Sequence, residues 1–276
     1  MELILNGLTE AVRLIASGDA EIFGVTLLTL LVSGLATLLS LLIGVPLGVV
    51  LGLVRFRGRR LVVSLVNTGM GMPPVVVGLW VSIFLWRSGP FGALRLIYTP
   101  AAIVIAQTLI ATPVITGFTI AAIQNLTPKL RLQILALGAS RWQFLLTILK
   151  ESRIALMAAV IAGFGSIVSE VGASMMVGGN IKGYTRVLTT ATSMEVSKGN
   201  FPVAVALSII LVALAFGVTY LLTAFQQWER KDRNLKPFED ATFISSDKSG
   251  TGHLDGLTDG PSESNGSANG HKGAAK

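Results

Sequence analysis

The chain has 276 residues, of which 51% are hydrophobic and only 13% are charged, and it contains no cysteine. Disulfides and thiolate metal sites are therefore excluded. The net charge of +7 does not indicate nucleic-acid binding, because the basic residues gather in short segments between long apolar runs, where they set the orientation of a membrane protein.

Long uncharged runs predict a helical membrane protein. Four runs contain no charged residue: residues 22–54, 61–86, 96–128 and 199–228. Each exceeds the roughly 20 residues that are needed to cross the hydrocarbon core. A fifth run, residues 154–181, is interrupted only by Glu170. The sequence therefore predicts an all-α, polytopic bundle of five transmembrane spans within residues 23–228.

The first half of the chain contains three distinctive features. Residues 1–22 are too polar for a span and predict an extracytoplasmic amphipathic segment at the membrane interface, with a frayed terminus as the alternative. The first span carries hydroxyl and glycine residues at helical spacing, which favours close helix packing in lipid. The second span contains Pro73-Pro74, which lack amide donors and predict irregular backbone against protein or a cavity.

A strongly basic loop separates the first two spans. Its four arginines are Arg55, Arg57, Arg59 and Arg60. The favoured interpretation is an orientation determinant on the cytoplasmic side. The alternative is a contact with anionic lipid or with a partner.

Polar side chains inside the later spans should face the interior of the bundle. The candidates for a transport pathway or for polar packing are Gln107, Thr112, Ser166, Ser169 and Glu170. For Glu170 we favour a structural role, in which the carboxylate accepts hydrogen bonds and holds its span in shape. The alternative is an electrostatic role along a route through the bundle, where its negative charge would strongly repel any anion at low dielectric.

Residues 127–152, between the third and fourth spans, predict two helices joined at a glycine. Thr127 can cap the first helix, and Pro128 fits its first position. Gly138 can adopt a positive φ and end that helix. Ser140 and Gln143 have the spacing of a capping box that begins the second helix.

This elbow carries bulky apolar side chains. Leu130, Ile134 and Leu137 follow at helical spacing and predict one apolar edge. Trp142 stands near the start of the second helix. A plain loop needs neither feature, so we expect the elbow to press into a groove on another protein.

The remaining chain supplies an external segment, a fifth span and a polar tail. Lys182 and Arg186 lie in the external segment, where their positive charge favours contact with an anionic ligand or partner. Residues 229–276 are rich in Ser, Gly and Asp and predict a cytoplasmic, largely disordered tail. Its two histidines are isolated. We predict no catalytic residue, metal or cofactor, and no phosphate-binding loop occurs, so ATP chemistry would belong to another chain.

The distribution of basic residues predicts the orientation. Roughly twice as many Lys and Arg residues lie on the elbow side of the spans as on the opposite side. The N-terminus is therefore expected outside the cell and the C-terminus in the cytoplasm.

The elbow resembles the cytoplasmic coupling loop of ATP-binding-cassette importer permeases through Gly138-Ala139, although Leu132-Gln133-Ile134 replaces the Glu-Ala-Ala of that family. Three further segments resemble the oxyanion branch of these permeases: Pro73-Pro74 through Gly78, Ala106-Gln107-Thr108, and Glu170 through Arg186. The chain is most similar to tungstate-type permeases, and molybdate and sulfate relatives share less.

The resemblance implies a type I ABC importer permease fold in the cell membrane. It also implies a homodimer, two ATPase subunits docked on the elbows, and an extracytoplasmic solute-binding protein. The implied function is the permease subunit of an ATP-driven oxyanion importer, with tungstate as the substrate and molybdate or sulfate as alternatives. The implied coupling residues are Leu137, Gly138, Ala139, Ser140 and Trp142.

Three other functions compete with that of an oxyanion permease. A permease for another small solute would share the same architecture. A secondary transporter usually shows internal repeats, but the elbow has no second copy and five spans do not halve. A membrane enzyme would need clustered nucleophiles, metal ligands or paired acids in the spans, where only Glu170 is available.

Overall fold

The computed structural model describes residues 7, 9, 13 and 20–234, with side chains up to Trp228. Most of the predicted segment 1–22, and the predicted tail beyond Asn234, lie outside the described residues. Within them, the regular secondary structure is helical. The helices are α2 Ala20–Leu53, α3 Arg59–Met70, α4 Pro74–Leu85, η1 Gly92–Leu94, α5 Pro100–Gln124, α6 Pro128–Ala136, α7 Arg141–Val168, α8 Gly172–Gly178, α9 Leu188–Ser197 and α10 Phe201–Asn234.

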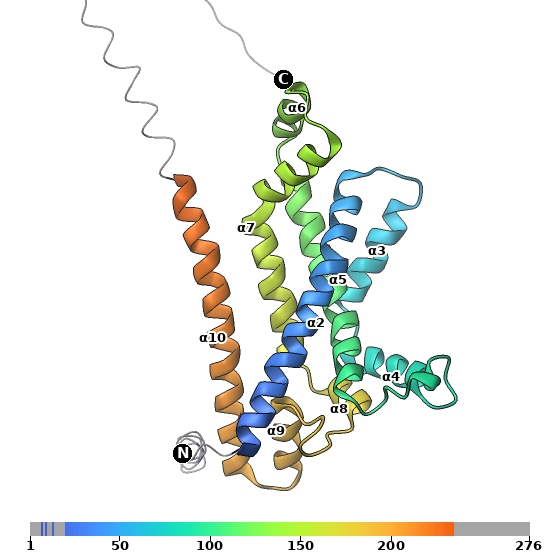
Figure 1. Ribbon diagram of the computed structural model, residues 1–276, viewed down its shortest axis with the longest axis vertical. Coiled ribbons are helices and arrows are strands. Elements are labelled where there is room, and N and C mark those ends of the chain that lie inside the picture. The colour runs from blue at the N-terminus through green and yellow to red at the C-terminus, as the bar shows by residue number, and fades with distance from the viewer. Residues whose placement is uncertain (1–6, 8, 10–12, 14–19, 235–276) are drawn as a thin grey trace, which may run out of the picture. The chain divides into compact units, whose positions relative to one another are not determined.

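Three of these helices, α2, α5 and α10, are continuous and apolar enough to cross a membrane (Figure 1). Two further spans exist if each bent pair of helices counts as one. The α3–α4 pair is bent by 102° and the α7–α8 pair by 61°. The predicted all-helical membrane class is confirmed, and each of the five predicted segments corresponds to one long helix or to one bent pair.

Small residues hold α2 against α5. Gly44, Gly48 and Gly52 recur at four-residue spacing, and a Cβ added at Gly48 would lie only 2.5 Å from the Cβ of Thr119. The Ser40 hydroxyl donates a hydrogen bond to the carbonyl of Thr108 in α5 (3.1 Å). Glycines let two backbones approach closely, as expected for helices that pack in lipid.

The break between α3 and α4 follows from Gly71, Pro73 and Pro74. The amide of Gly71 bonds back to the Thr68 carbonyl, which closes the last turn of α3. Pro74 occupies the first position of α4, where its missing donor costs nothing. The irregular backbone predicted at this dipeptide is therefore present, and α4 beyond it packs on α8.

The core is built around α5, which contacts α2, α3, α4, α7 and α8. Its fully buried side chains include Ile103 and Ile115, which belong to the same cluster as Ile167 of α7. A second cluster joins α2 to α10 through Val25 and Leu207. These contacts fix the positions of the α5–α7 and α7–α8 connections, where the predicted functional residues lie.

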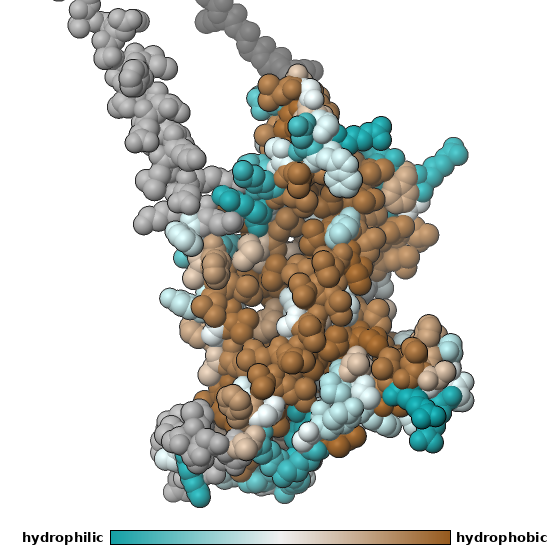
Figure 2. All heavy atoms as spheres, viewed as in Figure 1, coloured by the Kyte–Doolittle hydropathy of each residue, from teal (hydrophilic) through white to brown (hydrophobic). Residues whose placement is uncertain are grey.

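The surface divides into apolar and polar zones. Figure 2 shows hydrophobic side chains over the middle of the helices and hydrophilic side chains gathered toward the α6 end and the α9 end. Large apolar side chains are exposed along α2 and α10, for example Leu42 and Phe216. Such a band is what contact with lipid requires.

Candidate functional site

The elbow between α5 and α7 has the local geometry that its sequence predicts at the glycine and at the second helix. Gly138 adopts φ 74°, a conformation that favours glycine because it has no Cβ. The Ser140 hydroxyl accepts from the Gln143 amide (3.4 Å), and Gln143 Oε1 accepts from the Ser140 amide (2.8 Å), so the capping box is complete. The Thr127 side chain makes no capping bond; its backbone carbonyl accepts from the Leu130 amide instead.

The predicted single apolar edge of the elbow is wrong. Leu130 and Ile134 pack inward against Val49 and Ile148, whereas the Leu137 side chain is 86% exposed. Leu137 is the C-cap of α6, nearly one turn beyond Ile134, and it is not part of the buried cluster that contains Leu130 and Ile134.

Instead, the elbow presents a set of exposed apolar side chains that we call the docking face. Trp142 is 76% exposed and stands in the first turn of α7. Lys129 and Arg141 are exposed nearby in the sequence. Large exposed apolar side chains with charged residues nearby are typical of a protein interaction site. The members of the docking face are Leu132, Leu135, Leu137, Trp142 and Leu146.

A second group of polar residues lies at the break between α7 and α8. Glu170 Oε1 accepts from the Ala173 amide in the first turn of α8 (2.8 Å). The Thr189 hydroxyl donates to the Glu170 backbone carbonyl (2.9 Å), which ties the break to α9. Glu170 therefore has hydrogen-bond partners of the kind that a structural role needs, and its effect on transport stays a prediction.

Gln107 reaches the same region from α5. Its Nε2 lies 3.5 Å from the Ile167 carbonyl and 3.4 Å from the Ser174 hydroxyl. Its Oε1 is buried and has no hydrogen-bond partner among the described residues. Sequence reasoning missed Ser174 and Thr189, because their partners lie 67 and 19 residues away.

The other predicted pathway residues are satisfied within their own helices. Thr112 donates to the Thr108 carbonyl (2.6 Å), and Ser166 donates to the Gly163 carbonyl (2.7 Å). Ser169 is exposed and donates to its own helix as well (3.2 Å). The structure thus brings Gln107 to the α7–α8 break. The hydroxyls of Thr112, Ser166 and Ser169 bond within their own helices instead, and in the described part of the chain none of them is hydrogen-bonded to Gln107 or Glu170.

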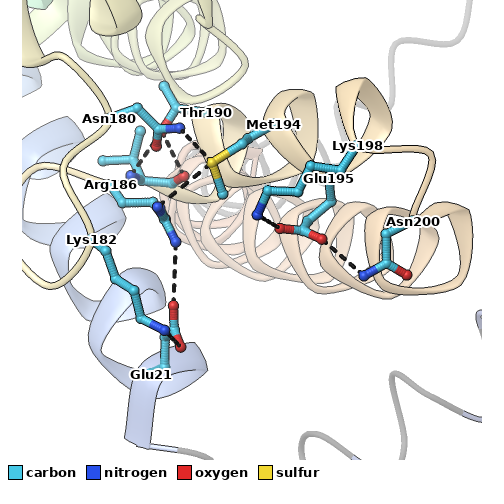
Figure 3. Close-up of polar contacts among 10 residues, drawn as sticks. Glu21, Asn180, Lys182, Arg186, Thr190, Met194, Glu195, Lys198 and Asn200 are labelled. Carbon is cyan, nitrogen blue, oxygen red and sulfur yellow. Dashed lines mark hydrogen bonds and ion pairs between the residues drawn. The ribbon is translucent and has the colours of Figure 1, made fainter.

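The predicted external cations share one carboxylate (Figure 3). Lys182 Nζ lies 2.7 Å and Arg186 Nη1 3.3 Å from the two oxygens of Glu21. The Lys182 side chain is 67% exposed and the Arg186 side chain only 14%. Glu21 lies in α2, 161 or more residues from both in the chain, so spacing along the sequence does not indicate this cluster.

A neighbouring carboxylate lies at the end of α9. Glu195 accepts from Lys198 Nζ (2.8 Å) and from Asn200 Nδ2 (2.9 Å) (Figure 3). The bond from Lys198, together with that from Asn200, lowers the pKa of Glu195 despite the opposing effect of burial. Within the described part of the chain, no group of three or more Asp, Glu or His side chains is placed to hold a metal ion.

Comparisons with known proteins agree with this architecture. The chain is 37% identical to the tungstate uptake system permease protein TupB of Peptoclostridium acidaminophilum over 82% of this chain and 100% of that protein. It is 38% identical to a Haloferax volcanii protein named "Probable anion ABC transporter permease protein", over 76% of this chain and 94% of that one. The TupB protein of Campylobacter jejuni is 35% identical, over 80% of this chain and 92% of that protein.

The family match covers the spans and the elbow. Residues 44–231 match the family described as "Binding-protein-dependent transport system inner membrane component". That range begins within α2 and includes the bent pairs, the elbow and most of α10. The match covers more than half of the chain, and the helices within it are long and apolar enough to cross a membrane. The chain therefore belongs to the family of binding-protein-dependent transport system inner membrane components and is a multi-pass membrane permease.

Proposed function

We propose that this chain is the permease subunit of an ATP-driven importer for tungstate, and that ATP is hydrolysed on a separate subunit. The observation that carries the proposal is the docking face, a set of exposed apolar side chains on a helical elbow between two spans. The likeness to permeases named for tungstate along most of the chain supports the substrate. Molybdate and sulfate have the same tetrahedral shape and charge and are the competing substrates.

The proposed assembly contains two copies of this chain, two ATPase subunits and one extracytoplasmic solute-binding protein. Each elbow would insert Trp142 and Leu137 into a cleft of one ATPase subunit on the cytoplasmic side. The proposed homodimer is supported by α3, in which no residue is buried although Asn67 and Thr68 are polar. Polar side chains facing lipid are costly, so a second copy is expected to cover that helix.

The proposed route uses neutral hydrogen-bond donors. Gln107 is buried and reaches the α7–α8 break, and this part of the chain offers no Lys or Arg that would trap a dianion. Outside, Lys182 is the accessible cation for docking the binding protein, while Arg186 mainly orders the cluster around Glu21. Permeases of this kind would leave most substrate discrimination to the binding protein.

The experiment is uptake of labelled tungstate by the complex of this chain, its ATPase and its binding protein, reconstituted in vesicles. Uptake should require ATP and compete with molybdate more strongly than with sulfate or phosphate. Absence of tungstate uptake by an active complex would refute the substrate, and competition by amino acids would assign another permease branch. Uptake that persists without the ATPase would make the chain a secondary transporter.

A matched pair of tryptophan variants tests the docking face. Trp142→Ala should weaken ATPase binding at least tenfold, because buried aromatic anchors dominate protein interfaces. Trp228→Ala removes the same side chain from the surface of α10, where it is 69% exposed, and should leave ATPase binding unchanged. Equal binding by both variants would refute the coupling role of the elbow.

A further inference from the structure

Three arginines line one cavity at the elbow end of the bundle. The cavity has a volume of about 380 Å³ and lies between the loop after α2, the end of α5 and the start of α6. Its charged lining consists of Arg55, Arg59 and Arg131, and no carboxylate takes part in the lining. Its size falls within the range of small ligand pockets.

Two of these arginines already donate hydrogen bonds to the ends of helices, and these bonds do not use all of their donors. Arg59 Nε donates to the Leu51 carbonyl in the last turn of α2 (2.7 Å). Arg131 Nη2 donates to the Ile123 carbonyl near the end of α5. A guanidinium has five N–H donors, and the buried Nε of Arg131 has no partner among the described residues. Unused donors therefore remain at the cavity.

The balance of charge decides what the cavity can bind. The carboxyl ends of α2 and α5 contribute about half a negative charge each, and the amino end of α6 contributes about half a positive charge. Against these stand three full positive charges, and in the part of the chain that the structure describes no ion pair neutralises them. The cavity therefore retains an excess of between two and three positive charges, about 2.5 by these terms, and would attract a dianion or a phosphate monoester or diester.

We propose that this cavity binds a phosphate-type oxyanion, which bridges the loop after α2 to the first turn of the elbow. Arginine suits this chemistry because its planar fork matches phosphate oxygens. An anionic phospholipid headgroup and free phosphate share this chemistry. The headgroup is favoured, because α2 and α5 end at the cavity and the apolar side chains Val54 and Phe56 are exposed beside it.

The proposal does not depend on the transported substrate. A bound headgroup would connect Arg55 to Arg131, and so would hold α6 in the orientation from which the docking face projects. It assigns the basic loop a binding role in addition to its effect on membrane orientation.

The test compares two arginine variants of the full-length chain. Arg55→Gln removes a cavity arginine that is exposed and makes no hydrogen bond in the described structure, so folding should be unaffected. Arg57→Gln is the matched control, because it removes the same charge two residues away and does not line the cavity. Binding is measured by native mass spectrometry of the purified chain with phosphatidylglycerol or phosphatidylcholine, and by thermal stability with added inorganic phosphate.

We expect phosphatidylglycerol to bind more tightly than phosphatidylcholine, and Arg55→Gln to weaken that binding about fivefold, as the loss of one charge near an anionic headgroup does. Arg57→Gln should change it less than twofold. If inorganic phosphate instead stabilises the wild type but not Arg55→Gln, the occupant is a soluble oxyanion and the site stands. The proposal would be overturned if Arg55→Gln and Arg57→Gln weaken binding equally. It would also be overturned if phosphatidylglycerol binds no more tightly than phosphatidylcholine and inorganic phosphate does not stabilise the wild type.

Discussion

The carboxylate of Glu170 offers the sharpest distinction between a structural and a pathway role. Its Oε1 accepts from the amide of Ala173, which is fully buried in the first turn of α8. A hydrogen bond to a charged group contributes about 1.5–3 kcal/mol, and a neutral one about 0.5–1.5 kcal/mol. Glu170→Gln keeps an oxygen acceptor and should therefore cost about 1 kcal/mol.

Glu170→Ala should be more damaging. It leaves the buried Ala173 amide without its partner, which costs about 1–3 kcal/mol, and it removes the side chain that caps α8. We expect lower expression and a lower Tm for Glu170→Ala, and near-normal Tm and substantial transport for Glu170→Gln. Ser197→Ala serves as the control, because that exposed hydroxyl bonds only to the Ser193 carbonyl of its own helix, away from the α7–α8 break.

The measurements are expression level, thermal stability of the purified chain and uptake by the reconstituted complex. If the role is structural, transport by the variants should follow their stability. If both variants keep wild-type stability and both lose transport to the same extent, the carboxylate acts in the pathway and the structural reasoning is refuted.

Three further predictions address the elbow, the helix interface and the external surface. Gly138→Val should weaken ATPase binding because a β-branched residue is strained at φ 74°, whereas Gly138→Asn should be tolerated; equal ATPase binding by the two would contradict this. Gly48→Val should destabilise the chain by about 1–3 kcal/mol through its clash with α5, and Gly34→Val, where a Cβ meets nothing within 4 Å, should leave Tm nearly unchanged. The bond from Lys198 lowers the pKa of Glu195. The Glu195 carboxylate therefore contributes stability above the ordinary carboxyl pKa, and this contribution is lost as the pH falls through the lowered pKa. A profile of Tm against acid pH should show this loss in the wild type and not in Glu195→Gln.

The sequence by itself determined the features that depend on near neighbours in the chain. Uncharged runs long enough to cross a membrane gave the helical class, because an unpaired backbone cannot exist in lipid. The positive φ of Gly138 and the capping box of Ser140 and Gln143 were predictable, since each depends on residues no more than a few positions apart. The break at Pro73-Pro74 was predictable for the same reason.

The tertiary structure decided which distant groups meet. Helix packing places Glu21 beside Lys182 and Arg186. Arg55 and Arg131 line one cavity because the C-terminal ends of α2 and α5 both lie at it. The exposure of Leu137, on the predicted edge that also holds Leu130 and Ile134, depends on how far the neighbouring helices cover α6, which periodicity alone does not show. Spacing along a chain fixes which side chains share a helix face, but the partner of that face is set by packing between helices that lie far apart in the sequence.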